Sequence, residues 1–360
     1  MNLRLILFVS ISIYLVGCNS YTEPKNVNQL MKRAVSVYNQ KISKNPYVAR
    51  AAYKEQAKCS GVYCMYTTGY GYLYSAGYES LIPRDNFKLL LKNVKKTDRG
   101  QSWLETIENT YATTRHKKQT GLPPGYGSAF TAFRRFEMKG FLTEDNMRNY
   151  SFTIVDTLDN IENESSAIVI QFKSQKNPAE YRGSILLDSE TFSIRNITLE
   201  KCHFYSENFR KWISVNGVIN YDLKGKQSFI STLKFHFNKN NIEYWIEIKS
   251  ESPLRQLEVD KRAYNAFSRD YNPYVYYNAE KWSNTEWANI LQFSIKTDFE
   301  KLQNDLGSGK ELQKQYTANS SKPFYTGVFD DGKELSFGFE GKYQIIKQKI
   351  DEFDKIVHQD

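Results

Sequence analysis

The feature that most constrains this chain is an alternation of apolar and polar side chains with a period of two, clearest between residues 181 and 200. That period is typical of a β-strand with one buried face. Asp188 to Thr191 supplies a turn, with an aspartate that can bond backbone groups two residues on. We predict a β-hairpin near the middle of a wide antiparallel sheet. The residues expected to share a face are Tyr181, Gly183, Ile185 and Leu187 on the first strand, and Phe192, Ile194 and Asn196 on the second, with Ile197 and Leu199 on its other face.

The same alternation recurs along most of the chain, separated by turns rich in Gly, Asn, Asp and Ser. Aromatic residues, which favour pleated surfaces, make up 15% of the sequence and support a β-rich body. Short connections imply antiparallel neighbours, and many strands require strong curling or partial closure. We expect a mainly β (α+β) fold with a large curved antiparallel sheet or half-barrel. The expected strands are 48–58, 62–75, 87–96, 149–158, 166–174, 180–188, 192–201, 212–224, 228–239 and 243–251.

Helical spacing of apolar residues marks the segments outside the sheet. An amphipathic helix is expected over 26–43, and the sheet domain over 26–252. The segment 102–148 interrupts the strands, and its residues 128–138 carry Phe130, Phe133 and Phe136 at one-turn spacing. Such an insertion can form a helical lid over one face, and plain packing is the alternative. Residues 253–360 form an aromatic-rich extension with expected helices at 297–306 and 341–357.

The N-terminal segment resembles an export signal. Residues 1–17 contain one cation, Arg4, and an apolar run that is too short for a permanent membrane helix and fits a signal peptide. The sequence Leu15-Val16-Gly17-Cys18 resembles a bacterial lipobox, in which Cys18 is acylated; an ordinary signal peptide is the alternative. Residues 18–25 then form a tether. Acyl chains anchor a protein without a transmembrane helix. Because Asn19 is not aspartate, we expect a lipid-anchored envelope protein at the outer membrane.

The formal net charge of +9 is compatible with nucleic acid or with an anionic membrane surface. The N-terminal signal decides between them, because an exported protein does not meet DNA or cytosolic RNA. Membrane contact through the N-terminal lipid is therefore the expected role, with no nucleic acid as partner.

Outside the anchor the chain has the cysteines Cys59, Cys64 and Cys202. An odd number leaves at least one thiol unpaired. If Ser60 and Gly61 form a hairpin turn, Cys59 faces Val62 and Cys64 lies diagonally across, a marginal spacing for an unstrained disulfide. A Cys59–Cys64 bridge is thus possible, and the reduced pair is equally consistent with the sequence.

One candidate ligand wall lies in the expected strand 62–75. Tyr66, Tyr70, Tyr72 and Tyr74 share one face there, opposite Gly69 and Gly71. Together with Phe130 and Phe133 of the insertion, these tyrosines are the predicted ligand-binding residues. Core packing beneath the N-terminal helix is the competing interpretation.

A family resemblance rests on the order of these elements: a helix, Tyr53-Lys-Glu-Gln, the Gly/Tyr-rich pair 62–78, an insertion, and hairpins that include Tyr181-Arg-Gly-Ser-Ile-Leu-Leu-Asp. Over residues 26–252 this order resembles Bacteroidota envelope lipoproteins whose half-barrel domain is similar to the LolA carrier fold. The carboxypeptidase-regulatory-like module that often precedes that domain is absent from this sequence. The resemblance implies a curved sheet with a concave, helix-covered apolar face and transfers no catalytic residues.

Catalytic motifs are missing from the sequence. The four histidines are scattered, and no zinc-protease, Walker or nucleophile-elbow pattern occurs. We therefore expect no metal, no cofactor and no catalysis. The predicted function is to bind a hydrophobic or amphipathic ligand such as an acyl chain, lipoprotein or glycolipid. The alternatives are an accessory subunit of an outer-membrane complex and, less favoured, a glycan hydrolase with paired carboxylates.

Overall fold

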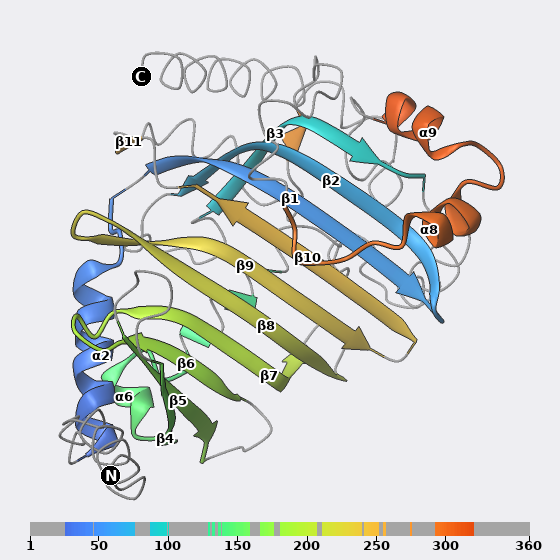
Figure 1. The fold of residues 1–360 in the computed structure, drawn as a ribbon. Coiled ribbons are helices and arrows are strands. Elements are labelled where there is room, and N and C mark those ends of the chain that lie inside the picture. Colours follow the sequence, from blue (N-terminus) through green and yellow to red (C-terminus); the bar gives the residue numbers. More distant parts are fainter. Residues whose placement is uncertain are drawn as a thin grey trace, which may run out of the picture.

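The structure, a computed structural model, describes residues 26–45, 47–75, 87–98, 100, 129, 132–133, 136–137, 139–158, 166–175, 181–206, 211–239, 241–251, 255–256, 274–275 and 292–319 (Figure 1). Its labelled helices are α2 (Val27–Lys41), α6 (Glu144–Met147), α8 (Phe299–Leu306) and α9 (Leu312–Asn319), and the described residues 129, 132–133, 136–137 and 139 of the insertion are also helical. Its strands are β1 (Tyr47–Cys59), β2 (Val62–Ser75), β3 (Phe87–Lys96), β4 (Tyr150–Leu158), β5 (Ala167–Ser174), β6 (Arg182–Asp188), β7 (Ile194–Ser206), β8 (Lys211–Lys224), β9 (Gln227–Lys239), β10 (Ile242–Ser250), β11 (Arg255–Gln256) and β12 (Tyr274–Val275).

The strands form one twelve-stranded sheet in the order β12-β3-β2-β1-β10-β9-β8-β7-β6-β5-β4, with β11 beside β1. Neighbours are antiparallel except β12 and β3, which are parallel. The predicted mainly β fold with a large curved antiparallel sheet is confirmed. Each of the ten expected strands has a counterpart, and β4 to β10 follow one another as hairpins.

The pairing of β1 with β10 determines the path of the insertion. It joins β1–β3 to the far side of the hairpin series, so that β3 and β4 lie toward opposite ends of the sheet. The chain between them must therefore cross the sheet. Its described residues 129, 132, 133, 136, 141 and 142 are buried in the main core. The insertion covers the sheet because the topology requires it to cross there.

Ring contacts of the insertion show how strongly the sheet curls. Phe133 contacts Phe87 of β3 with ring centroids 6.5 Å apart, and Phe136 contacts Phe172 of β5 at 6.2 Å. In a flat sheet β3 and β5 would be about 38 Å apart, eight strand spacings. Three residues of a helix rise only about 4.5 Å. The two ends of the sheet therefore bend toward each other around the inserted helix, which lies on the concave face.

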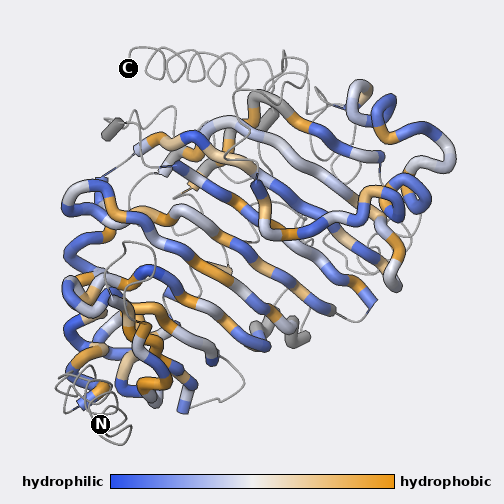
Figure 2. Tube along the Cα trace, in the orientation of Figure 1, coloured by the Kyte–Doolittle hydropathy of each residue, from blue (hydrophilic) through white to orange (hydrophobic). Residues whose placement is uncertain are grey.

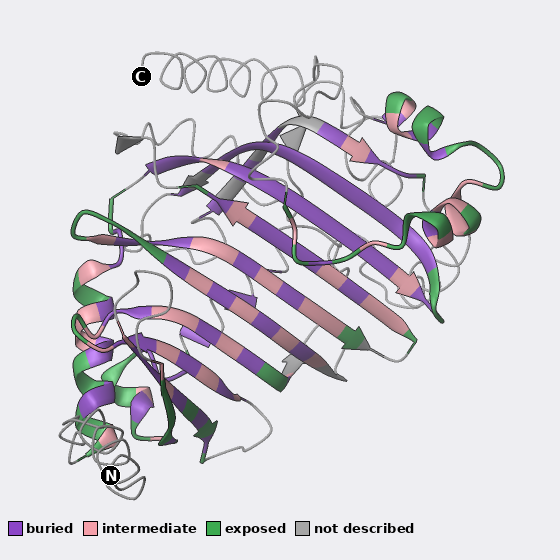
Figure 3. Cartoon of the chain, in the orientation of Figure 1, coloured by how far each residue is buried: buried purple, intermediate pink, exposed green. Residues whose placement is uncertain are grey.

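The two faces of the sheet differ in burial (Figure 3). Strands β7–β9 alternate between buried and half-buried residues, whereas β1 and β2 are buried on both faces. Hydropathy alternates along the same strands (Figure 2). The inward residues belong to one apolar core with α2 and the insertion, and a second small core contains Leu302 and Leu312 of α8 and α9.

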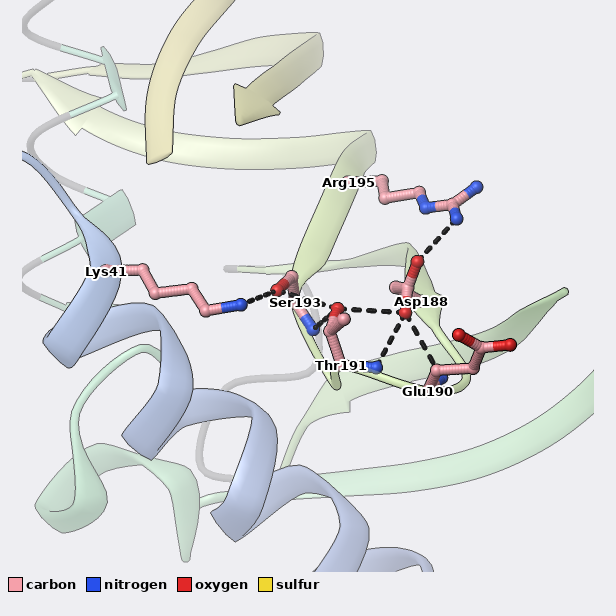
Figure 4. A network of polar contacts seen from close by, with 6 residues as sticks. All are labelled: Lys41, Asp188, Glu190, Thr191, Ser193 and Arg195. Carbon is pink, nitrogen blue, oxygen red and sulfur yellow. Dashed lines mark hydrogen bonds and ion pairs between the residues drawn. The ribbon is translucent and has the colours of Figure 1, made fainter. Parts of the chain in front are cut away.

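Helix α2 begins where the sequence predicts. The side chain of Asn26 accepts a hydrogen bond from the backbone nitrogen of Asn28, which caps the helix. At the other end Lys41 donates to the hydroxyl of Ser193 at 2.8 Å, which joins α2 to the turn between β6 and β7 (Figure 4).

That turn depends on Asp188, as predicted. Its Oδ1 atom accepts from the backbone nitrogens of Glu190 and Thr191, at 3.1 and 2.7 Å, and Oδ2 accepts from Arg195 (Figure 4). The predicted faces of the second strand need correction. The register shifts between Leu186 and Leu187, so that Leu187 pairs with Ile194 and Leu186 with Asn196.

This bulge at the start of β7 puts Ile194 on the same buried face as Ile197 and Leu199. A strict alternation had placed Ile194 opposite them. The faces predicted for Tyr181, Ile185 and Leu187 are confirmed, since all three belong to the main core.

Helix α8 confirms the expected helix at 297–306, and α9 is an additional helix in a stretch that lacks a clear apolar pattern. The signal segment 1–17, Cys18, the tether 18–25 and the expected helix 341–357 lie outside the described residues. No helix within the described segments is long and apolar enough to span a membrane.

Candidate functional site

The concave face carries a continuous apolar row that runs across seven strands. Its residues are cross-strand partners, one from each of the adjacent strands β1, β10, β9, β8, β7, β6 and β5. Each of these side chains is at most 2% exposed. They are Tyr53, Ile248, Leu233, Ile219, Ile197, Ile185 and Ile170. Neighbouring β-strand side chains in such a row are close enough to contact, and together they form one apolar surface.

Phenylalanines of the inserted segment cover part of this surface. Phe136 packs edge-on against Tyr181 with ring centroids 5.5 Å apart. Phe141 contacts Phe172 at 4.8 Å and Phe152 at 5.6 Å. Phe136 and Phe141 are fully buried. The cover and the sheet are thus joined by an aromatic cluster, a contact that is large in apolar area and does not interrupt the backbone ladder of the sheet.

A carboxylate lies within this apolar core. Glu55 is 0% exposed and shares the inward face of β1 with Tyr53 and Ala57. Its Oε2 atom accepts hydrogen bonds from the hydroxyl of Tyr53 at 2.5 Å and of Tyr244 at 2.8 Å. Burying a carboxylate is costly unless hydrogen bonds compensate for lost hydration. The two tyrosine hydroxyls supply that compensation on the concave face.

A second buried carboxylate joins the cover to α2. Glu137 of the insertion is 7% exposed, and its Oε1 atom accepts from the hydroxyl of Tyr38 at 2.7 Å. The ring of Tyr38 meets Tyr221 of β8 edge-on at 5.6 Å. Burial, and then the charge of Glu137, raise the pKa of Tyr221 well above its usual value. Helix, insertion and sheet therefore meet at one polar contact.

The predicted tyrosine wall lies on the other face. Met65 and Leu73 of β2 belong to the concave core, and Tyr66, Tyr70 and Tyr72 alternate with them. Tyr66 is 4% exposed and packs against Leu302 and Leu312 of the C-terminal helices. Burial raises its pKa well above the usual range.

Phe133, by contrast, belongs to the concave core. The structure therefore separates the tyrosines from Phe133 by the thickness of the sheet, so they do not line one common wall. The side chains of Tyr74 and Phe130 lie outside the described residues. Ligand binding by either set stays a prediction.

A C-terminal strap, residues 292–297, crosses the convex face of β1 and β10. Glu247, which is 0% exposed, accepts from the backbone nitrogens of Ser294 at 3.0 Å and Ile295 at 2.9 Å. Lys54 donates to the carbonyl of Ile295 at 2.6 Å, and Gln56 to that of Lys296 at 3.2 Å. These polar contacts fasten the strap to the face opposite the insertion.

The pKa of Lys54, one of the residues that hold the strap, is lowered. Burial lowers the pKa of this lysine to about 8, with the charge of Glu247 acting in the opposite direction and that of Lys296 in the same direction. Desolvation disfavours the charged ammonium, and the carboxylate compensates only in part. Lys54 and Glu247 therefore both hold the strap backbone, the lysine through a carbonyl and the carboxylate through two N–H groups.

Among the described residues no group of histidine, cysteine, aspartate and glutamate side chains is arranged to hold a metal ion. The buried carboxylates Glu55 and Glu137 instead accept hydrogen bonds from tyrosine hydroxyls. Such an arrangement offers an apolar surface with isolated polar anchors, which suits binding of an amphipathic molecule.

Comparisons with known proteins add little beyond these observations. No known protein family matches the sequence, and no curated protein does. Among solved structures, an outer membrane lipoprotein-sorting protein domain from Vibrio parahaemolyticus is similar over 68% of this chain and 100% of its own, with 13% identity and a TM-score of 0.30.

A DUF1329 family protein from Desulfovibrio piger covers 66% of this chain and 96% of its own, with 8% identity and a TM-score of 0.28. The structure of MucB in complex with MucA(peri) covers 63% of this chain and 94% of its own, with 6% identity and a TM-score of 0.18. Likeness at this level carries no argument about function, so the function proposed below rests on the molecule's own geometry.

Sequence reasoning missed Glu55, Glu137 and Glu247. A signal for Glu55 was present, since strict alternation from Tyr53 to Ala57 places this acid on the inward face. Glu137 directly follows Phe136 on a helix whose apolar face was identified. The partner of Glu247 lies 47 residues away in the strap, and no local pattern indicates it.

Proposed function

We propose that this chain is a lipid-anchored, non-catalytic protein of the cell envelope that binds a hydrophobic or amphipathic ligand between the concave face of its sheet and the inserted helical cover. The observation that carries the proposal is the apolar row from Tyr53 to Ile170, which forms one core with the phenylalanines of an insertion that also contact Phe172 beside the row. An apolar face covered by a separate segment can open without loss of sheet hydrogen bonds.

The proposed ligand takes the place of the cover. In the closed form Phe133, Phe136 and Phe141 occupy the concave face, as an acyl chain would. The hydrogen bond between Tyr38 and Glu137 helps to hold the cover closed. A ligand that binds only the open form must overcome the free energy that favours the closed form. Its apparent affinity is therefore lower when a smaller fraction of the molecules is open.

The first test is mass spectrometry of full-chain protein purified from its native membrane in mild detergent. A diacylglyceryl-modified Cys18 together with a bound lipid supports the proposal. An unmodified N-terminal peptide that starts elsewhere contradicts the anchor. Absence of any co-purified lipid contradicts the carrier role if the next measurement also fails.

That measurement is titration of the delipidated protein with a fluorescent fatty acid. Tyr38→Phe removes one hydrogen bond of the closed form, worth about 1 kcal/mol, and should tighten probe binding by roughly fivefold. Leu223→Ala, at a position 48% exposed on β8, is the control and should bind as the parent protein does. No saturable binding in any of the three proteins refutes the carrier.

An accessory role in an outer-membrane complex is the second candidate, and one observation favours it. Strand β4 ends the sheet, and its Ile154 and Val155 are 36% and 46% exposed. Edge strands with exposed apolar side chains pair readily with another chain. If a stoichiometric protein partner co-purifies without lipid, this role replaces the carrier.

A further inference from the structure

The turn between β1 and β2 brings two cysteines into contact. Ser60 and Gly61 form the turn, with φ angles of 52° and 82°, and Cys59 pairs with Val62 as the sequence predicts. Simple alternation would leave Cys64 diagonally across. The Sγ atoms of Cys59 and Cys64 are nevertheless 2.9 Å apart.

A register shift explains this approach. Ala57 pairs with Met65 but Lys58 pairs with Tyr63, so that Cys64 is the extra residue of a β-bulge. Cys64 stays on the concave side, where alternation from Val62 also places it, and both cysteines join the main core at 3% and 0% exposure. A separation of 2.9 Å is shorter than that of two sulfur atoms that merely touch, and approaches the covalent distance of about 2.05 Å.

We propose that Cys59 and Cys64 form a disulfide that fixes the bulged end of the β1–β2 hairpin. The oxidant is an external disulfide, such as that of a thiol oxidoreductase. One cysteine thiolate attacks it, releases one thiol of the oxidant and forms a mixed disulfide; the other thiolate then displaces the second thiol. The two cysteines lose two protons and two electrons, and the oxidant gains them.

The order of events follows from burial. Contact with Cys59, and then burial, raise the pKa of the Cys64 thiol far above its usual value. Because the thiolate is the reacting species, exchange is slow once the core has closed. The bond therefore forms while the hairpin is still accessible, and the closed core then protects it from reduction.

Cys202 provides an internal comparison. It is 0% exposed on β7, with three strands between it and β1. Its Sγ atom lies 3.5 Å from the carbonyl of Arg182 and 3.8 Å from that of Glu200. Burial raises its pKa to about 11. This thiol shares the compartment and the burial of the pair, and differs in its lack of a neighbouring sulfur among the described residues.

The disulfide has a structural consequence at α8. Tyr63, inside the bulge, donates its backbone N–H to Asp305 at 2.8 Å, and its hydroxyl accepts from the backbone nitrogen of Asp298 at 3.3 Å. The carbonyl of Cys64 accepts from Gly100 at 3.0 Å. Fixing the bulge thus fixes the surface on which the first C-terminal helix docks.

Mass spectrometry tests the bond. Cells are lysed in denaturant with an alkylating reagent and no reductant, and the protein is digested with trypsin. Cleavage after Lys58 and Arg84 puts Cys59 and Cys64 on one peptide, and cleavage after Lys201 and Arg210 isolates Cys202. We expect no label on the first peptide before reduction and two labels after it, with one label on the Cys202 peptide in both samples.

Two labels on the first peptide before reduction would overturn the proposal. The N-terminal peptide in the same digest reports the lipid anchor separately, so failure of the disulfide and failure of the proposed function are distinguishable.

Proteolysis of the native protein tests the link to α8. Reductant strong enough to open the bond should speed tryptic cleavage after Lys301 severalfold. The variant Cys59→Ser/Cys64→Ser should be cleaved at the fast rate with or without reductant, and Cys202→Ser should behave as the parent protein. Equal rates in all samples would show that the bond does not support the docking of α8.

Discussion

The substitution Glu247→Gln should release the C-terminal strap from the convex face. Glutamine keeps the size of the side chain, but one of the two carboxylate oxygens becomes an NH₂ donor. The Oε1 atom of Glu247 accepts the backbone N–H of Ser294, and Oε2 accepts that of Ile295. In either orientation of the amide, its NH₂ group faces the backbone N–H of Ser294 or that of Ile295, and two donors meet without an acceptor.

The magnitude follows from these contacts. A buried donor left without its acceptor costs about 1–3 kcal/mol, and hydrogen bonds to a charged acceptor are worth about 1.5–3 kcal/mol. The charge of Glu247 also acts against the effect of burial on the pKa of Lys54. Lys54 keeps its bond to the carbonyl of Ile295, so we expect a cost of about 3 kcal/mol from the unsatisfied donor and the lost charged hydrogen bond.

Tryptic cleavage after Lys296 measures the opening of the strap directly. This exposed lysine lies within the strap, and cleavage of a docked backbone requires local release. When reclosing is fast, the rate follows the open population, so about 3 kcal/mol corresponds to roughly a hundredfold faster cleavage.

Glu243→Gln is the matched control, on the same strand and face as Glu247 but with a half-buried side chain. Its effect should remain within about 0.5 kcal/mol, or roughly twofold in rate. If the two variants are cleaved at the same rate, the role assigned to Glu247 is wrong.

Three further predictions concern the core and the pH dependence of stability. Phe136→Ala should lower the free energy of unfolding by about 3–5 kcal/mol in urea titrations, whereas Phe299→Ala, at a side chain 58% exposed, should cost less than about 1 kcal/mol. Gly217→Ala should cost about 1–3 kcal/mol, because the new Cβ would lie 2.6 Å from the ring of Phe235; Phe235→Leu in the same chain should recover part of the loss, and a neutral single variant would refute this contact. Between pH 8 and 10 the unfolded chain keeps the proton of Lys54 while the folded chain loses it, so the free energy of unfolding should rise with pH; an equal rise in Lys54→Met would assign it elsewhere.

The strands were predictable because alternation is a local property. A half-buried strand repeats every two residues wherever it sits in the sheet, so β4–β10 could be delimited from the sequence. The pairing of β1 with β10 is not local. It follows from which apolar faces can be buried together, and it alone places the insertion across the sheet. The insertion was therefore predictable as a helix but not as a crossing segment.

Bulges mark a second limit of sequence reasoning. An extra residue at the start of β7 moves Ile194 to the opposite face from that predicted, and another, Cys64, shifts the register of β2 so that Met65 pairs with Ala57. In each case one extra residue inverts the alternation that follows. These shifts appear only when the cross-strand register is known.

The face of the candidate tyrosines could not be predicted, for a related reason. Alternation correctly groups Tyr66, Tyr70 and Tyr72, but it does not say which face of a doubly covered strand is the concave one. Strand β2 is buried on both faces, so a contrast between an apolar inner face and a polar outer face does not mark the concave side. The helices that pack over Tyr66 lie more than 230 residues later, at Leu302 and Leu312, and their contact could not be inferred from either segment alone.

The two covers act on different faces, and this makes their roles separable. The insertion meets the concave face through Phe136 and helix α2 through Glu137, whereas the strap meets the convex face through Glu247 and Lys54. The sheet between them is held by continuous backbone hydrogen bonds, so release of one cover leaves the other face in place. Glu247→Gln should therefore speed cleavage of the strap without changing fatty-acid binding, and Tyr38→Phe should do the reverse. If either variant changes both measurements equally, the two faces are coupled through the sheet, and the ligand site cannot be assigned to the concave face alone.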